Sequence, residues 1–206
     1  MSNSQLNPRI VPVQTKVAVI VGSLRKESIN RRVALALADL APNGVRLEII
    51  EIGQLPLFDP DLDDEGRAPE AWIAFRDRIE TYDAVLFVTP EYNRSVPGVL
   101  KNAIDVGSRP YGKSVWNNKP AAVVSVSPGA IGGFGANHHL RQSLVFLNMP
   151  ILQQPEAYVG NAGNLFGEDG GLAQDATREF LKTFMAAFAS WIGLIASAPR
   201  TAKSAA

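Results

Sequence analysis

Residues 16–23, KVAVIVGS, are the stretch of sequence that decides the fold. The run is rich in valine and isoleucine and stops at a glycine, which is typical of a short β-strand that is buried on both faces. Residues 46–52 alternate as a second strand, and residues 84–89 and 121–127 are further apolar runs of the same kind. A shorter fifth strand is expected to begin at residues 150–153.

Helical patterns separate these strands and follow the last of them. Apolar residues recur at helical spacing over residues 30–40, 70–81, 97–106, 138–147 and 175–195. Strands that alternate with helices form a parallel sheet, and right-handed crossovers place the helices on both of its faces. The sequence therefore predicts an α/β fold with a doubly wound, five-stranded parallel sheet.

Length and composition indicate a single domain with a substantial core. The chain has 206 residues, of which 46 % are hydrophobic. We expect the domain to span residues 15–197, between an N-terminal tail at 1–14 and a C-terminal tail at 198–206.

Charge and cysteine content exclude several classes of function. The chain has 20 Lys and Arg against 20 Asp and Glu, so it lacks the positive excess by which proteins bind nucleic acids or anionic membranes. It has no cysteine, which excludes disulfides, thiol nucleophiles and thiolate metal sites. No apolar leader is visible, and the apolar runs look too short to span a membrane, so we expect a cytoplasmic protein without a membrane partner.

The loop after the first strand has the chemistry of a phosphate site. Ligands of doubly wound sheets bind beyond the carboxyl ends of the strands. Residues 22–30, GSLRKESIN, combine hydroxyl, amide and cationic side chains where a helix begins, and a helix N-terminus attracts phosphate. The loop lacks the fingerprints of nucleoside triphosphate and dinucleotide sites. Taken alone, it is also compatible with a simple helix N-cap at Ser28.

The loop after the third strand, residues 89–98, reads TPEYNRSVPG. Pro90 and Pro97 restrict its backbone, while Tyr92 and Asn93 suit the edge of a planar heterocycle. An ordinary connection between a strand and a helix is the alternative interpretation.

The loop after the fourth strand, residues 127–136, reads SPGAIGGFGA. Its four glycines would let the backbone approach a flat ligand closely, at an entropic cost that favours a functional reason. The alternative is an exposed surface loop. Three unusual loops at one sheet edge favour a binding site over three separate coincidences.

Three weaker signals have simpler interpretations. Asp59, Asp61, Asp63 and Glu70 have the spacing of a calcium loop, but Asp64 stands where glycine is required, so we expect a solvated acidic loop. Two adjacent histidines point to different sides of a helix, so they predict contacts at the helix start or between subunits. These histidines are His138 and His139. The last helix carries an aromatic stripe that we expect to be buried, formed by Phe180, Phe184, Phe188 and Trp191.

The three loops resemble the NADPH-dependent FMN reductase family and, within it, the bacterial chromate and quinone reductases. The resemblance rests on GSLRxxSxN from Gly22, TPEYNxSxPGxLKNAID from Thr89 and SPGAIGG from Ser127, in this order along about residues 16–160. It implies a flavodoxin-like fold with strand order 2-1-3-4-5 and non-covalent FMN. It also implies NADPH or NADH as co-substrate and a homodimer or homotetramer with active sites close to subunit contacts.

Carried over position by position, the resemblance assigns binding residues to each loop. The FMN phosphate would be held by Ser23, Arg25, Ser28 and Asn30. The isoalloxazine ring would be lined by Pro90, Glu91, Tyr92, Asn93 and Arg94, with Ser127 and Gly129 on its other side. Tyr92 and Arg94 would also meet the substrate. No catalytic side chain and no metal ligand is assigned, because N5 of the flavin carries the chemistry.

The resemblance predicts an FMN-dependent NAD(P)H oxidoreductase with a ping-pong cycle. Hydride would pass from NAD(P)H to FMN, and two electrons would then reduce a quinone, with chromate or azo compounds as further acceptors. Arg94 is the candidate that would attract anionic chromate, and it is also a candidate for an ion pair with Glu156 of another subunit. The alternative is a flavodoxin-like electron carrier without NAD(P)H turnover, which the neutral net charge disfavours because such carriers tend to be acidic.

Overall fold

The computed structural model describes residues 14–197, so the predicted tails lie outside the described residues apart from residue 14. Five parallel strands form one sheet in the order β2-β1-β3-β4-β5, which confirms the predicted topology. The strands are β1 (Thr15–Val21), β2 (Val45–Ile50), β3 (Ala84–Thr89), β4 (Ala121–Val126) and β5 (Ala157–Val159).

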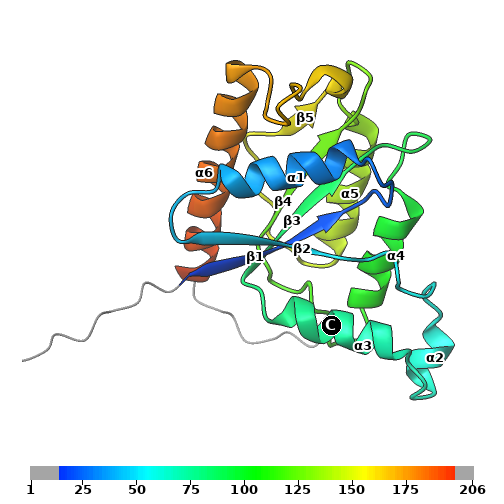
Figure 1. Cartoon of the computed structure of the whole chain (residues 1–206). Helices are drawn as coiled ribbons and strands as arrows, with labels where there is room; N and C mark the ends of the chain where they lie inside the picture. Colours follow the sequence, from blue (N-terminus) through cyan, green and yellow to red (C-terminus); the bar gives the residue numbers. More distant parts are fainter. Residues whose placement is uncertain (1–13, 198–206) are drawn as a thin grey trace, which may run out of the picture.

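Helices cover both faces of the sheet (Figure 1). They are α1 (Ile29–Asp39), α2 (Pro60–Asp64), α3 (Glu70–Glu80), α4 (Gly98–Gly107), α5 (Phe134–Phe146) and α6 (Asp175–Ser197), with a 3₁₀ turn η1 (Ala162–Asn164). Helices α1 and α6 pack on one face, and α3, α4 and α5 pack on the other. The chain thus forms three layers, with the sheet in the middle.

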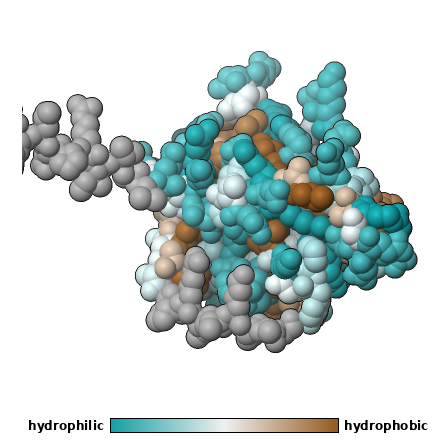
Figure 2. Space-filling model, turned by 90° about the horizontal axis from the view of Figure 1, so that it is seen from below, coloured by the Kyte–Doolittle hydropathy of each residue, from teal (hydrophilic) through white to brown (hydrophobic). Residues whose placement is uncertain are grey.

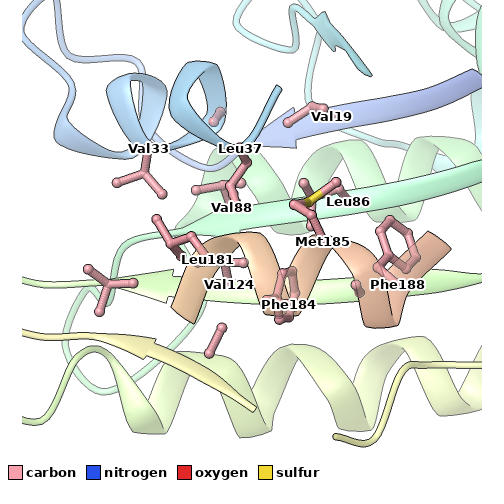
Figure 3. Close-up of a cluster of buried hydrophobic side chains, with 14 of the residues drawn as sticks. Val19, Val33, Leu37, Leu86, Val88, Val124, Leu181, Phe184, Met185 and Phe188 are labelled. Carbon is pink, nitrogen blue, oxygen red and sulfur yellow. The ribbon is translucent and has the colours of Figure 1, made fainter. Parts of the chain in front are cut away.

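The central strands are buried on both faces because their residues alternate between two separate cores. In β3, Leu86 and Val88 point toward α1 and α6, whereas Val85 and Phe87 point toward α3, α4 and α5. Figure 3 shows the first core, in which side chains of the sheet, α1 and α6 interdigitate. All four of these β3 residues have 0 % exposure, so the apolar run is explained by burial on two sides.

Helix α6 confirms one expectation in part and departs from another. It is long and apolar enough to cross a membrane by length and composition, contrary to the expectation of short apolar runs only. Its buried face packs into the core seen in Figure 3 and includes Phe184 and Phe188, as predicted. Phe180 is 37 % exposed, so it lies outside the predicted buried stripe. Trp191 is half-buried, and its ring N–H donates to the carbonyl of Pro150 (2.8 Å).

The fifth strand lies later in the sequence than predicted. Residues 150–153 run beside the start of β4 but form only an isolated bridge, between Ala121 and Ile151. Pro155 follows, and proline has no backbone N–H to donate to a ladder. Regular pairing begins at β5, where Ala157 and Val159 are buried against β4.

Two helices depart from the predicted boundaries in ways that matter for function. Helix α5 begins at Phe134, four residues before the predicted start, so the last three residues of the glycine-rich segment are helical. Helix α2 occupies part of the segment that was expected to be a solvated acidic loop. The expectation is wrong for Asp63, whose carboxylate is buried and pairs with both terminal nitrogens of Arg76 (2.8 and 2.6 Å).

The face of the molecule below α2 and α3 is mainly polar. Figure 2 views this side and shows hydrophilic side chains over most of it, with hydrophobic ones in small separate areas. Among the described residues on that side, no broad apolar surface is visible.

Candidate functional site

A cavity of about 200 Å³ opens where the loops after β1, β3 and β4 meet at the carboxyl edge of the sheet. The predicted residues that line it are Ser23, Arg25, Ser28, Asn30, Pro90, Glu91, Tyr92 and Ser127. The predicted residues Asn93, Arg94 and Gly129 lie outside its lining. Sequence reasoning missed four lining residues, Ile29, Val126, Pro128 and Ala162. These four are apolar, so no polar signal could have identified them.

The loop after β1 ends in a helix N-terminus whose hydrogen-bonding capacity is only partly used. The Ser28 hydroxyl accepts a hydrogen bond from the backbone N–H of Arg31 (3.2 Å), which confirms the N-cap. Asn30 follows at 6 % exposure, and its side-chain oxygen has no hydrogen-bond partner. A buried acceptor without a hydrogen bond is costly, so a ligand that donates to the Asn30 oxygen would be favoured. The first turn of α1 also holds no acidic residue.

Gly22 brings the first two loops into direct contact. A Cβ at this position would lie 3.1 Å from the Thr89 hydroxyl and 3.2 Å from the ring of Pro90. The Gly22 backbone N–H also donates to the carbonyl of Val88 (2.9 Å). A side chain at this position would therefore force Thr89 or Pro90 to move by a few tenths of an ångström, because the β3 loop passes close to the end of β1.

The loop after β3 forms a tight reverse turn. Tyr92 and Ser95 exchange both backbone hydrogen bonds (3.0 and 2.9 Å). The two residues between them have left-handed backbone, with φ of 49° at Asn93 and 65° at Arg94. This is the geometry of a type I′ turn, which asparagine tolerates well and arginine does not. The turn presents Tyr92 and Arg94 at the rim of the cavity, where their side chains are exposed.

Glu91 joins this turn to helix α5. One carboxylate oxygen accepts the backbone N–H of Ala136 (3.0 Å), and the other lies 3.5 Å from the Arg94 guanidinium. Ala136 is in the first turn of α5, where a negative charge is favourable. Glu91 lines the cavity as predicted, but its carboxylate holds the turn against α5.

The glycines of the third loop are explained by contacts within the chain. Gly132 and Gly133 have φ of 64° and 75°, and a Cβ on Gly132 would lie 2.7 Å from the carbonyl carbon of Tyr158. A Cβ on Gly135 would lie 2.9 Å from the Glu91 carboxylate. The expected approach of glycine backbone to a flat ligand is thus not needed to explain these three residues. Gly129 has more space, because its nearest neighbour is the Ser127 hydroxyl at 3.6 Å.

The two histidines of α5 have separate partners, as their predicted opposite directions require. The Nδ1 atom of His139 lies 2.9 Å from the Ser95 hydroxyl, which is a second link between α5 and the turn. The Nε2 atom of His138 lies 3.0 Å from the Tyr158 hydroxyl. Burial raises the pKa of Tyr158 to about 12, and the neighbouring Glu156 carboxylate adds to the rise. The histidines lie in the second turn of α5 rather than at its start.

Residues 15–164 match the family model described as NADPH-dependent FMN reductase. The chain belongs to this family. The match begins with β1 and ends at η1, so it contains all three loops that line the cavity.

Curated relatives and solved structures support the same assignment. A quinone reductase from Pseudomonas putida is 67 % identical over 178 residues, which cover 86 % of this chain and 95 % of the relative. A 2-hydroxy-1,4-benzoquinone reductase from a Burkholderia species is 45 % identical over 177 residues, with 86 % and 96 % covered. The structure of FerB, a flavoenzyme NAD(P)H:(acceptor) oxidoreductase from Paracoccus denitrificans, aligns with a TM-score of 0.82 at 43 % identity and covers 87 % of this chain and 98 % of FerB.

The predictions of fold, enzyme class and cofactor class are confirmed at the level of the family. The chain has the flavodoxin-like strand order and belongs to a family of NADPH-dependent FMN reductases. It is therefore an oxidoreductase, and the electron-carrier alternative loses its support.

Proposed function

We propose that this protein is an FMN-dependent NAD(P)H:quinone reductase. The observation that carries the proposal is the cavity in which the α1 N-terminus and the Pro90–Pro97 loop meet, although they are far apart in sequence. The names of the Pseudomonas putida and Burkholderia relatives support quinones as the acceptor class.

The residues of the cavity fit an FMN phosphate. Ser23, Arg25 and Ser28 supply two hydroxyls and a cation at the N-terminus of α1, and Asn30 supplies a buried amide whose oxygen has no partner. The unpaired Asn30 oxygen can accept only from a donor such as a ligand hydroxyl, while the N–H₂ group of the same amide, helix N–H groups and arginine can donate to phosphate oxygens. These four residues would hold the phosphate.

The residues at the other end of the cavity would orient the ring and leave one side open to acceptors. Pro90, Glu91 and Tyr92 would line the ring, and Ser127 would lie on its other side. When bound, FMN supplies the hydride and two-electron chemistry. The protein would position the reactants, because Glu91 and His139 fix the turn that carries Tyr92. Asn93, Arg94 and Gly129 would act at the rim.

The acceptor side of the site is exposed, which supports a permissive choice of planar molecules. Tyr92 is 47 % exposed and can stack on a quinone ring. The Arg94 side chain is 79 % exposed and carries a positive charge that Glu91 only partly neutralises at 3.5 Å. We propose chromate and azo compounds as secondary acceptors, with Arg94 attracting the anionic ones.

We also propose that the protein is a homodimer or homotetramer in the cytoplasm, where NAD(P)H is available. The outer side of α5 supports self-association, because Phe134, Val145 and Phe146 are 49, 67 and 86 % exposed. Exposed apolar side chains along one helix are typical of an interface. Within one subunit Arg94 pairs with Glu91, so a pair between Arg94 and Glu156 of another subunit stays a prediction.

Anaerobic visible spectroscopy tests the proposed function. We expect the purified protein to show flavin bands that bleach on addition of NADPH or NADH and return on addition of a quinone. Bands that persist with both nicotinamides would indicate a carrier instead. A colourless protein that fails to take up added FMN would contradict the proposal.

Analytical ultracentrifugation tests the oligomeric state. Phe146→Glu places a charge on the exposed side of α5, and we expect it to shift the protein toward monomer. Ile73→Glu is the matched control, because Ile73 is 47 % exposed on α3. A wild-type protein that is monomeric at micromolar concentration would contradict self-association.

A further inference from the structure

A second cavity, of about 290 Å³, lies between α1, residues 166–172 and the first turn of α6. We call it the α1–α6 groove. The residues that matter for its chemistry are Arg32, Leu35, Asp39, Phe166, Leu172 and Arg178. It combines two guanidinium groups with apolar walls, and Asp39 is the one acidic residue in its lining.

The Arg32 guanidinium is held in place and has no acidic partner in the described part of the chain, so it can bind an anion. Its guanidinium lies over the ring of Phe166, 4.1 Å from the centroid, which fixes the group and leaves its N–H edges available. No carboxylate lies within ion-pair distance of Arg32 among residues 14–197, whereas the adjacent Arg31 pairs with Glu51 at 2.7 Å. A cation in the first turn of a helix is disfavoured by the helix dipole, so an anion beside Arg32 would remove that cost.

Arg178 places a second cation on the opposite wall. It is in the first turn of α6, and its side chain donates to the carbonyl of Leu172 (3.4 Å). Leu35 and Leu172 supply apolar surface to the same lining. An anionic group attached to a flat, largely apolar body would match this arrangement of charge and surface.

The groove lies next to the candidate cofactor site along the chain. Ile29 and Asn30 line the first cavity, and Arg32 lines the groove two residues later on α1. On the facing segment, Ala162 lines the first cavity and Phe166 lines the groove. From Asn30 to Asp39 the helix extends about 14 Å at 1.5 Å per residue. A dinucleotide whose nicotinamide meets the flavin ring beside Tyr92 would therefore extend past the residues proposed for the FMN phosphate to bring its other end to Arg32.

We infer that the α1–α6 groove binds the adenosine 2′-phosphate end of NADPH, and that Arg32 determines specificity for NADPH over NADH. The inference rests on the proposed function, because it names the co-substrate of that site. The N–H edges of Arg32 and Arg178 bind the phosphate oxygens, and the leucine surface accepts the purine. NADH lacks the 2′-phosphate, so it gains nothing from the two arginines.

Calorimetric titration of the purified holoprotein with 2′,5′-ADP and with 5′-AMP tests the groove without any turnover. We expect 2′,5′-ADP to bind more tightly than 5′-AMP. Arg32→Ala should weaken 2′,5′-ADP binding roughly tenfold to a hundredfold, the effect of losing a hydrogen bond to a charged group. Arg31→Ala is the matched control, since its neighbouring side chain is paired with Glu51 and does not line the groove. Equal binding of the two nucleotides, or equal effects of the two substitutions, would overturn the inference.

Steady-state kinetics separates this inference from the proposed function. We expect Arg32→Ala to lower the ratio of kcat/KM for NADPH to kcat/KM for NADH at least about tenfold, and Arg32→Lys to restore part of it. An unchanged ratio in an active enzyme would overturn the groove assignment and leave the proposed function intact. A wild-type protein that oxidises neither nucleotide would contradict the proposed function. The calorimetric titration alone would then show whether the groove binds the 2′-phosphate.

Discussion

The loops after β1 and β4 differ in how many of their contacts and hydrogen bonds are made within the chain. The β4 loop is rich in glycine, and three of its glycines pack closely against other parts of the chain, as the contact that a Cβ on Gly132 would make with Tyr158 shows. The β1 loop has one glycine, Gly22, and beyond it lies Asn30, whose buried oxygen has no partner. The β1 loop therefore keeps unused hydrogen-bonding capacity, whereas close packing within the chain accounts for three glycines of the β4 loop.

The largest effect on stability is expected for a substitution in the β4 loop. Gly132→Ala should lower the free energy of unfolding by about 2–4 kcal/mol, because it adds left-handed strain and a clash with Tyr158. Gly129→Ala in the same loop should change it by less than about 1 kcal/mol, because Gly129 has space for a methyl group. Urea denaturation of the FMN-free protein measures both. Equal losses would show that the loop is not packed as described.

Ser28→Asp tests the β1 loop by separating helix capping from phosphate binding. Aspartate caps a helix as well as serine does, so the stability of the FMN-free protein should stay within about 0.5 kcal/mol. A carboxylate at the phosphate position should weaken FMN binding about a hundredfold through charge repulsion. Fluorescence titration of FMN measures this change, and unchanged affinity would place the phosphate away from α1.

Asn30 and Asn137 are both buried, but only Asn137 has hydrogen-bond partners within the described chain for its side-chain oxygen and nitrogen. Asn30→Ala should weaken FMN binding about tenfold and alter the stability of the FMN-free protein by less than about 1 kcal/mol, because its oxygen has no partner to lose. Asn137 donates to the Ser125 hydroxyl (3.2 Å) and accepts from Arg141 (2.9 Å). Asn137→Ala should therefore lower stability by about 1–3 kcal/mol. Denaturation and FMN titration of both variants measure the difference, and the reverse pattern would contradict it.

The smallest effect is expected at the rim. Arg94→Ala should raise the KM for chromate roughly twofold to fivefold at low ionic strength, because an exposed charge contributes little. The KM for a neutral quinone should change less, and added salt should remove the difference. Equal changes for both acceptors would contradict an electrostatic role for Arg94.

The alternation of strands and helices and the parallel sheet were predictable from local sequence, whereas the strand order came from the family resemblance. Runs such as residues 84–89 must be buried on both faces, and helices between them impose parallel pairing. Binding at the carboxyl edge follows from that topology. The prediction was wrong at residues 150–153, because the pairing of a short edge strand depends on its neighbours and on Pro155 rather than on local propensity.

The partners of polar and charged side chains were beyond the reach of sequence reasoning. The buried pairing of Asp63 with Arg76 and the bond from Ala136 to the Glu91 carboxylate join residues from different elements. The same holds for the α1–α6 groove, where Arg32 meets Phe166 across the gap between two segments. Long-range pairs of this kind leave no periodic trace in the sequence.

By itself, the sequence determined four of the five strands, the loops that follow them and the residue types that those loops would offer to a phosphate and a flat ring. These properties depend on hydrophobic periodicity and on local turn and helix chemistry. The tertiary structure alone decided which of those residues are already satisfied by the chain and which remain open to a ligand. Whether a polar side chain has a hydrogen-bond partner depends on distances between segments far apart in sequence, as the difference between Asn30 and Asn137 shows.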